Sequence, residues 1–280
     1  MKHFKSFMAP QLQQYADYRL ALGYAKKCIK PPLLAFDRYL LGQNATWDQL
    51  QPAFFLQLRA KISDHPNTVN KILSALRSFF QFLVRNDICV DNPLKDIPPL
   101  PERYFVPFVF SPAQTQRLLQ AAGQNIRKTP KYFLTDMAIY LAIVLLARCG
   151  MRINEPLRMH RDQYCRHDGT VYIEKTKFRK DRLIPVPKIA LTQIENYLAV
   201  RTALRADDQN PYLLAARKQR QLRGRQVRDA FHQAVKDIGL SRPKQVIGNI
   251  TFGKPLPHSL RHAFAINTLN QIKARGNCPQ

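Results

Sequence analysis

Prolines interrupt the chain about a third of the way along it, at Pro93, Pro98, Pro99, Pro101 and Pro107. Proline fixes φ, removes a backbone donor and pushes the preceding residue toward extended geometry. A helix or a central strand cannot run through such a stretch, so the chain is expected to fold as two parts. We place a helical domain at 1–95, a proline-rich linker at 96–110 and a second domain at 111–280.

The first part carries helical patterns separated by short breaks. In the clearest one, apolar residues from Val69 to Leu83 recur at i, i+3, i+4 and i+7, and Lys71 and Arg77 fall elsewhere on the helical wheel. Thr46 and Gln49 have the spacing of a capping box that opens another helix. These patterns predict a compact bundle of four short helices with basic faces.

The second part begins with a helix start at Ser111-Pro112-Ala113-Gln114, where a capping serine precedes a proline. A nearly all-apolar helix at 132–149 is expected to be the core of the domain, and Gly150 is a natural residue to end it. Further helices are expected at 154–160, 189–204 and 224–238, and from Pro257 onward.

Two β-rich segments, 170–176 and 182–186, flank the basic stretch 177–181 and predict a hairpin. Pro185 places the second strand at a sheet edge, because proline cannot donate to the ladder. The predicted fold class is mainly α with a small β-sheet: a helical N-terminal domain followed by an α+β domain.

The chain is strongly basic. Its 44 Lys and Arg residues exceed 19 Asp and Glu, which gives a net charge of +25 and a pI near 10.2. A surplus of this size predicts a polyanionic partner, most simply nucleic acid. The densest cluster, within 217–225, is either a phosphate-tracking segment or a polar loop, and the sequence favours neither. The candidate DNA-binding residues are Lys71, Arg77, Lys175, Arg179, Lys180, Arg217, Lys218, Arg220, Arg223 and Arg225.

Several other classes of protein are disfavoured. The five cysteines are scattered and show no C-x-x-C spacing, which indicates a reducing compartment with neither disulfides nor a zinc site. The N-terminus lacks a signal-peptide pattern, and the longest apolar run is shorter than the roughly 20 residues a membrane span needs. We expect a cytoplasmic protein, encoded by a bacterium or a mobile element, that has no membrane contact.

Two arginines stand beside apolar helical sequence in distant parts of the chain. Arg152 follows the all-apolar helix in Gly150-Met-Arg-Ile-Asn-Glu155, and Arg261 lies in His258-Ser-Leu-Arg-His262. A guanidinium is always charged and its planar fork of donors suits a phosphate. His258 lies three residues before Arg261, on the same face of a helix. With Lys177 from the hairpin, these side chains would form a clamp for a phosphodiester.

Taken in this order, the motifs resemble the tyrosine recombinase (phage integrase) family. The Arg152 motif, the strands around Lys177 and the His258–His262 motif match the family's pattern, and the helical first domain with its linker resembles the family's core-binding domain. The resemblance covers nearly the whole chain. It implies site-specific DNA recombination or integration through a 3′-phosphotyrosine intermediate, on double-stranded DNA, by a tetramer and without a cofactor.

The resemblance also implies residue roles. Arg152 and Arg261 would hold the non-bridging oxygens of the scissile phosphate and stabilise its transition state. Lys177 would protonate the leaving 5′ oxygen, although Lys175 and Lys180 compete for this role. His258 would donate to the phosphate or relay a proton. Glu155 and His262 are expected to support these groups, with His262 pointing away from them.

The chain departs from the family at its nucleophile, which should be a tyrosine after the second arginine motif. All eleven tyrosines precede Arg261. The 19 residues that follow it contain no Tyr or Trp, and their one His is His262 of the same motif. The expectation is therefore a truncated catalytic domain that binds DNA but is inactive by itself, and whose self-association the truncation would impair.

Three alternatives remain. A non-catalytic DNA-binding protein derived from a recombinase would share the charge without needing the clamp. A metal-dependent nuclease needs clustered carboxylates, which are scarce here. An RNA-binding protein lacks support from any RNA-recognition motif.

Overall fold

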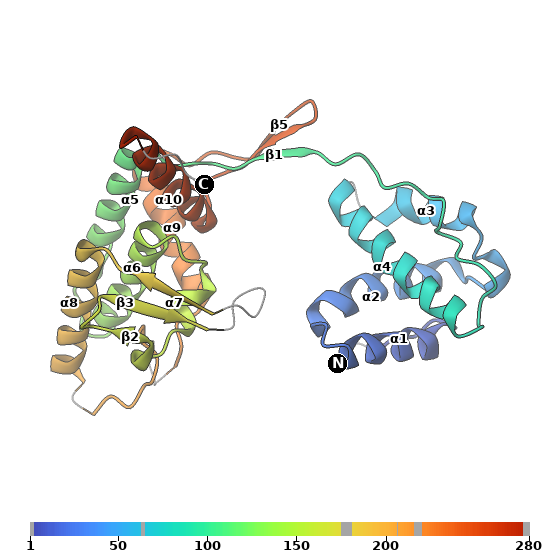
Figure 1. The fold of residues 1–280 in the computed structure, drawn as a ribbon, viewed down its shortest axis with the longest axis horizontal. Helices are drawn as coiled ribbons and strands as arrows, with labels where there is room; N and C mark the ends of the chain where they lie inside the picture. The colour runs from blue at the N-terminus through green and yellow to red at the C-terminus, as the bar shows by residue number, and fades with distance from the viewer. Residues whose placement is uncertain (1–2, 63–64, 175–180, 206, 216–219, 277–280) are drawn as a thin grey trace. The chain divides into compact units, whose positions relative to one another are not determined.

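The computed structural model describes residues 3–62, 65–174, 181–205, 207–215 and 220–276, and the chain divides into two compact units, Met1–Tyr104 and Phe105–Gln280 (Figure 1). The first unit is helical. Its elements are α1 (Ala9–Ala21), α2 (Lys26–Gln43), the 3-10 turn η1 (Trp47–Gln49), α3 (Pro52–Ile62) and α4 (Pro66–Arg85).

The apolar stripe predicted in the first unit lies on α4 and is buried. Val69, Leu76 and Leu83 have no exposed surface, and the helix packs against α1, α2 and α3. The expected capping box is present, with the Gln49 side chain accepting from the Thr46 backbone N–H at 3.2 Å. It encloses η1, however, and α3 begins only at Pro52. A proline at the first helical position explains this later start, because its fixed φ suits a helix and its missing donor costs nothing there.

The segment after α4 is bound along that helix. The Asn70 side chain donates to the carbonyl of Leu100 and accepts from its N–H, both at 2.8 Å. The Arg77 guanidinium donates to the carbonyls of Leu94, at 3.1 Å, and Ile97, at 2.8 Å. The proline-rich chain up to Leu100 is therefore part of the helical unit, held by side chains that satisfy its unpaired backbone groups.

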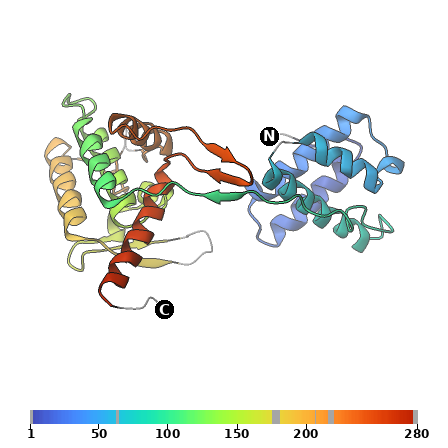
Figure 2. The ribbon, with the colours of Figure 1, turned by 90° about the horizontal axis from the view of Figure 1, so that it is seen from above.

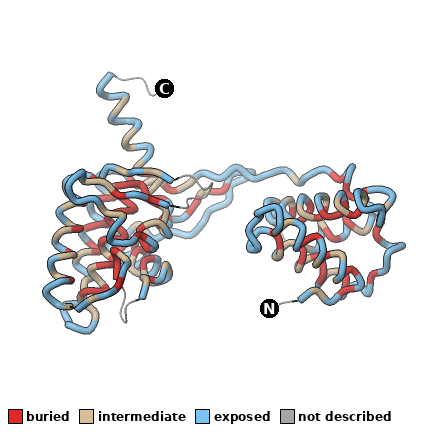
Figure 3. The backbone as a smooth tube through the Cα atoms, turned by 60° about the horizontal axis from the view of Figure 1, so that its bottom comes forward, coloured by how far each residue is buried: buried red, intermediate tan, exposed pale blue. Residues whose placement is uncertain are grey.

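The second unit is built around α6 (Phe133–Arg148), which is buried on nearly every side, as the all-apolar run predicted (Figure 3). It packs against α5, α8, α9 and α10. The helices of this unit are α5 (Pro112–Gln124), α6, α7 (Asn154–Arg158), η2 (Arg161–Gln163), α8 (Lys188–Leu204), α9 (Gly224–Asp237) and α10 (Pro257–Ala274). α5 starts at the predicted cap, with Ser111 accepting from the Gln114 N–H at 3.1 Å. The last turns of α10 are exposed and extend away from the rest of the unit (Figure 3).

The predicted hairpin strands form one small antiparallel sheet. β2 (Tyr164–Cys165), β3 (Thr170–Ile173) and β4 (Arg182–Pro185) lie in that order, with Ile173 opposite Arg182 and Thr170 opposite Pro185. β4 is at the edge, as Pro185 indicated. The tip of the hairpin, 175–180, lies outside the described residues.

A second small sheet was not predicted. β5 (Gln245–Ile247) and β6 (Ile250–Phe252) form a hairpin, and β1 (Tyr104–Val106) lies beside β6 (Figure 2). Ile247 pairs with Ile250 across a two-residue Gly-Asn turn in which Gly248 has φ +55°. β-branched residues around such a turn are a hairpin signal. The mainly α fold with small sheets is as expected.

Among the cysteines that the structure describes, Cys149 is buried in the core, whereas Cys28 and Cys165 are exposed. Cys28, Cys89, Cys149 and Cys165 are free thiols. Cys149 is packed in the core of the second unit, where burial raises its pKa to about 12, so this thiol is inert at neutral pH. In the described part of the chain, every helix is too short or too polar to cross a membrane.

Candidate active site

Arg152 and Arg261 come together at the end of α6. Gly150 leaves the helix with φ +59°, a conformation that favours glycine, and a Cβ at this position would overlap the Phe264 ring of α10. The Arg261 guanidinium donates to the Gly150 carbonyl at 2.6 Å, across 111 positions of sequence. The close packing of α10 on Gly150 therefore places the second arginine beside the loop that carries the first.

Glu155 is the carboxylate at the centre of this group. It accepts from the Arg152 backbone N–H at 2.7 Å, from Arg152 Nη1 at 3.0 Å and from Arg182 Nη2 at 2.7 Å. Burial by itself would raise the pKa of Glu155, but the Arg152 backbone and the side chains of Arg182 and Arg152 lower it overall. Glu155 is consequently ionised and accepts hydrogen bonds from both arginines, and its supporting role in the site stays a prediction.

His258 and His262 lie next to each other on α10. Their ring centroids are 4.7 Å apart and the rings are nearly perpendicular, at 85°. The expectation that His262 points away is wrong, because residues four apart share a helix face. Partial burial lowers the pKa of His258, and the nearby His262, Arg261 and Arg152 lower it further. A neutral imidazole at pH 7 is able to accept a proton as well as donate a hydrogen bond.

The site is crowded with positive charge. Burial lowers the pKa of Arg261, and the charges of Arg152 and Arg182 act in the same direction, while Glu155 opposes them. Arginine nonetheless keeps its proton in proteins. Three guanidinium groups around the Glu155 carboxylate leave a surplus of positive charge that a bound phosphate would relieve.

The general-acid candidates belong to the basic segment between β3 and β4. Lys177 and its competitors Lys175 and Lys180 lie outside the described residues, as do three predicted DNA-binding residues, Arg179, Arg217 and Lys218. Of the residues proposed for the helical unit, Lys71 is exposed on α4 beside a cavity of about 590 Å³. Arg77 is half-buried against backbone carbonyls.

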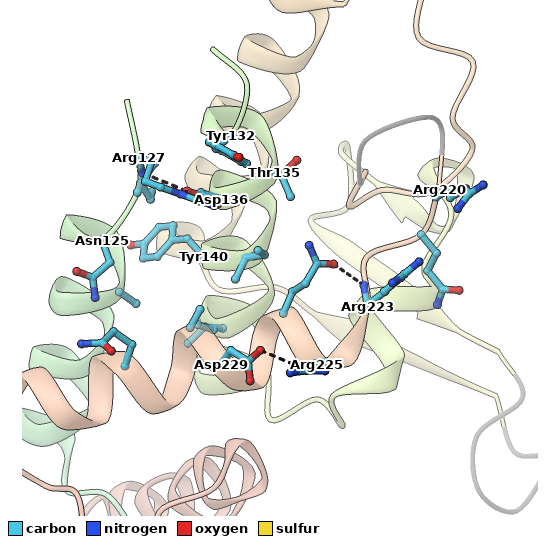
Figure 4. Close-up of a pocket in the computed structure, with 18 residues that line it drawn as sticks. Asn125, Arg127, Tyr132, Thr135, Asp136, Tyr140, Arg220, Arg223, Arg225 and Asp229 are labelled. Atoms are coloured by element: carbon cyan, nitrogen blue, oxygen red, sulfur yellow. Dashed lines mark hydrogen bonds and ion pairs between the residues drawn. The ribbon is translucent and has the colours of Figure 1, made fainter. Parts of the chain in front are cut away.

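Arg220, Arg223 and Arg225 line a different part of the second unit. Figure 4 shows them around a cavity of about 1010 Å³ between α6 and α9, whose lining includes none of the clamp residues. Arg225 is 3.6 Å from Asp229, a loose and exposed ion pair. In the described part of the chain, no ion pair to Arg220 or Arg223 is found. Both side chains are exposed and available to an anion.

Sequence reasoning missed one member of the charged group, Arg182. The available signal was its position as the first residue of the strand that follows the basic stretch with Lys177. Among the described residues, no group of three or more His, Cys, Asp or Glu side chains is arranged to hold a metal ion. The absence of a cofactor stays a prediction.

Comparison with known proteins identifies the class. The second unit overlaps a match to the phage integrase family at residues 109–272. The fold is similar to that of a lambda integrase fragment in a dimer bound to a COC′ core site, with a TM-score of 0.70 and 18% identity over 94% of this chain and 90% of that one. It is also similar to XerH recombinase bound to a palindromic difH substrate, with a TM-score of 0.67 and 17% identity over 96% and 78%.

Sequence relatives agree with the fold. The chain is 30% identical to tyrosine recombinase XerC of Alcanivorax borkumensis over 236 residues, which cover 83% of this chain and 70% of that protein. It is 28% identical to a putative integrase/recombinase, y4rE, of Sinorhizobium fredii over 96% and 83%. The chain belongs to the phage integrase family, the tyrosine recombinases.

Proposed function

We propose that this chain binds duplex DNA and holds one backbone phosphate between Arg152 and Arg261, as a component of site-specific recombination. The observation that carries the proposal is that both arginines lie at the Gly150 loop. Arg152 is part of that loop, and Arg261 donates a 2.6 Å hydrogen bond to the Gly150 carbonyl. Supporting it are the family membership and the net charge of +25.

The roles follow from the chemistry of phosphoryl transfer. Arg152 and Arg261 would bind the non-bridging oxygens, where removing one preorganised donor typically costs about 10²–10³ in rate. His258 would donate to the phosphate or relay the nucleophile's proton, and Lys177 would protonate the leaving oxygen. The unit Met1–Tyr104 would bind DNA, and Phe105–Gln280 would hold the phosphate.

The nucleophile separates two forms of the proposal. Within the 280 residues no tyrosine follows Arg261, the position at which the family carries it. We infer that this polypeptide binds its site without forming a covalent 3′-phosphotyrosine by itself. The second form is a DNA-binding protein derived from a recombinase, with a binding function alone.

The assembly belongs to the same proposal. A lambda integrase tetramer bound to a Holliday junction has a similar fold, with a TM-score of 0.68 and 17% identity. We infer that the chain self-associates on double-stranded DNA, in the cytoplasm, without membrane contact. Crosslinking with and without a bound duplex would detect this assembly, and a monomer under both conditions would contradict it.

The experiment begins by selecting bound fragments from a random duplex library at fixed salt. The selected duplex should compete better than RNA of equal length. Each phosphate is then replaced in turn by a neutral methylphosphonate. Replacement at one position should weaken DNA binding by the wild-type chain but not by Arg152→Ala, because only the clamp contacts the charge of that phosphate.

A nicked suicide version of the selected duplex tests the missing nucleophile. No adduct that survives SDS is expected from the 280-residue chain. An adduct would contradict the inferred lack of a nucleophile, whereas equal binding of RNA, or a phosphate scan unaffected by Arg152→Ala, would contradict the clamp.

A further inference from the structure

Arg182 connects the base of the hairpin to the clamp. It is the first residue of β4, directly after the basic hairpin segment, and its Nη2 lies 2.7 Å from Glu155 Oε2. The other carboxylate oxygen, Oε1, is 3.0 Å from Arg152 Nη1. The Glu155 side chain is only 9% exposed, against 31% for Arg182 and 35% for Arg152. One buried acid is thus shared between two partly exposed arginines.

This sharing decides how Arg152 is held. Arginine and a carboxylate prefer a bidentate contact in which both oxygens meet two guanidinium nitrogens. Here Oε2 is occupied by Arg182 Nη2 and the Arg152 backbone N–H, so the ion pair joins Arg152 to Glu155 through Nη1 and Oε1. If Arg182 were removed, Oε2 would lose a charged donor and would compete for the Arg152 fork that a phosphate needs.

We propose that Arg182 is a positioning residue of the phosphate clamp, which acts on Arg152 through Glu155. The proposal rests on the proposed function, since it assigns Arg182 a part in the same anion site. Arg182 occupies Glu155 Oε2 and so keeps the Arg152 guanidinium turned toward the phosphate. Its own charge also reaches the clamp, because it contributes to the lowered pKa of Arg261.

A second ion pair in the same unit lies on the surface, away from the clamp residues, and supplies a control. Arg166 Nε lies 3.1 Å from Glu195 Oε2, but its side chain is 79% exposed. Such a surface pair contributes little, and it lacks a third charged partner from the clamp. Arg166→Ala therefore removes the same charge and the same kind of ion pair as Arg182→Ala, without touching Arg152 or Glu155.

The test titrates the full chain with orthovanadate, a tetrahedral oxyanion that stands in for a phosphate group, and measures affinity by calorimetry. Wild type should bind, and Arg152→Ala or Arg261→Ala should remove the binding. Arg182→Ala should weaken it about tenfold, within the range of coupling between contacting residues. In an Arg152→Lys background, which has no fork to orient, Arg182→Ala should have less than about a twofold effect. Arg166→Ala should leave the affinity unchanged.

Two outcomes would overturn the role of Arg182: unchanged affinity in Arg182→Ala, or an equal loss in the wild-type and Arg152→Lys backgrounds. If Arg182→Ala does not fold, Arg182→Lys and Arg182→Gln replace it. Lysine should recover part of the affinity that glutamine loses, and equal affinities would refute the proposal. If vanadate binding is unaffected by Arg152→Ala and Arg261→Ala, the proposed function fails instead.

Discussion

The candidate site depends on a residue that has no side chain. Gly150 adopts φ +59°, admits the Phe264 ring and offers its carbonyl to Arg261. A larger residue would be strained by the backbone conformation and would displace the ring. The two arginines meet because this position is glycine.

Gly150→Ala is expected to lower the free energy of unfolding by about 1–3 kcal/mol through backbone strain, with a further cost for moving Phe264. Vanadate affinity should fall as well, because Arg261 would lose its alignment with the Gly150 carbonyl. Urea denaturation and calorimetry measure the two effects.

Gly239→Ala is the matched control, because Gly239 has φ +73° but nothing within 4 Å of a Cβ. Gly239→Ala should lower the free energy of unfolding through backbone strain and should keep full vanadate affinity. Equal loss of vanadate affinity in both variants would show that Gly150 has no special role in the site.

The His258 imidazole makes stability depend on pH. Its pKa is lower in the folded chain than in the unfolded chain, because partial burial and the charges of His262, Arg261 and Arg152 disfavour the imidazolium. The unfolded chain therefore binds the proton more readily, and this contribution to stability is lost as pH falls below the unfolded value of about 6.5.

His258→Gln should remove that contribution. Between pH 7.5 and 5, the wild type should lose more unfolding free energy than the variant, as followed by circular dichroism in urea. A steeper loss in the variant, or identical pH profiles, would show that His258 is not destabilised in its charged form.

At the scale of elements, α4 has two faces with different tasks. Its apolar stripe forms the core of the helical unit, while Asn70 and Arg77 bind the proline-rich segment on the other side. A backbone segment with prolines cannot satisfy itself by forming secondary structure. Side-chain donors from α4 do this instead, so the segment is ordered up to Leu100.

Arg77→Ala should loosen this segment. The variant leaves two carbonyls without their donor, which is expected to lower the free energy of unfolding by about 1–3 kcal/mol. Amide exchange should rise over residues 92–100. Lys71→Ala, on an exposed position of the same helix, should leave exchange unchanged. Unaltered exchange in Arg77→Ala would mean that Asn70 and the prolines hold the segment without Arg77, and Arg77 would remain a candidate for DNA contact.

At the scale of the molecule, the basic side chains are not equally available to bind a phosphate. Arg127 is bound by both side-chain oxygens of Asp136, at 2.7 and 2.9 Å, whereas Arg223 is exposed without an ion pair in the described part of the chain. Only a cation that meets a phosphate and releases a counterion contributes to the salt dependence of DNA binding. The two arginines line the same cavity, which makes them a matched pair.

Arg223→Gln should reduce the slope of log affinity against log salt by about 1, and Arg127→Gln should change it less. Fluorescence anisotropy with a labelled duplex between 50 and 200 mM salt provides the measurement. Equal slopes for wild type and Arg223→Gln would favour a polar loop over a phosphate-tracking segment at 217–225.

Local patterns were enough to predict much of the fold. The stripe on α4, the apolar α6, the Ser111 cap and the strands flanking the basic hairpin were all expected, because periodicity and capping depend on neighbours in sequence. The sheet of β1, β5 and β6 was missed. Its strands have three residues each, and β1 joins from a distant part of the chain.

The sequence by itself determined which chemical groups are available: two arginines in recognisable motifs, the histidine beside the second, and an excess of basic residues. Only the tertiary structure decided how they combine. The contact of Phe264 with Gly150 joins the motifs, His262 turns out to face His258, and Arg182 enters through Glu155. These contacts link residues that are distant in sequence or orient side chains in space, and such geometry is set by the packing of whole helices rather than by the identity of neighbouring residues.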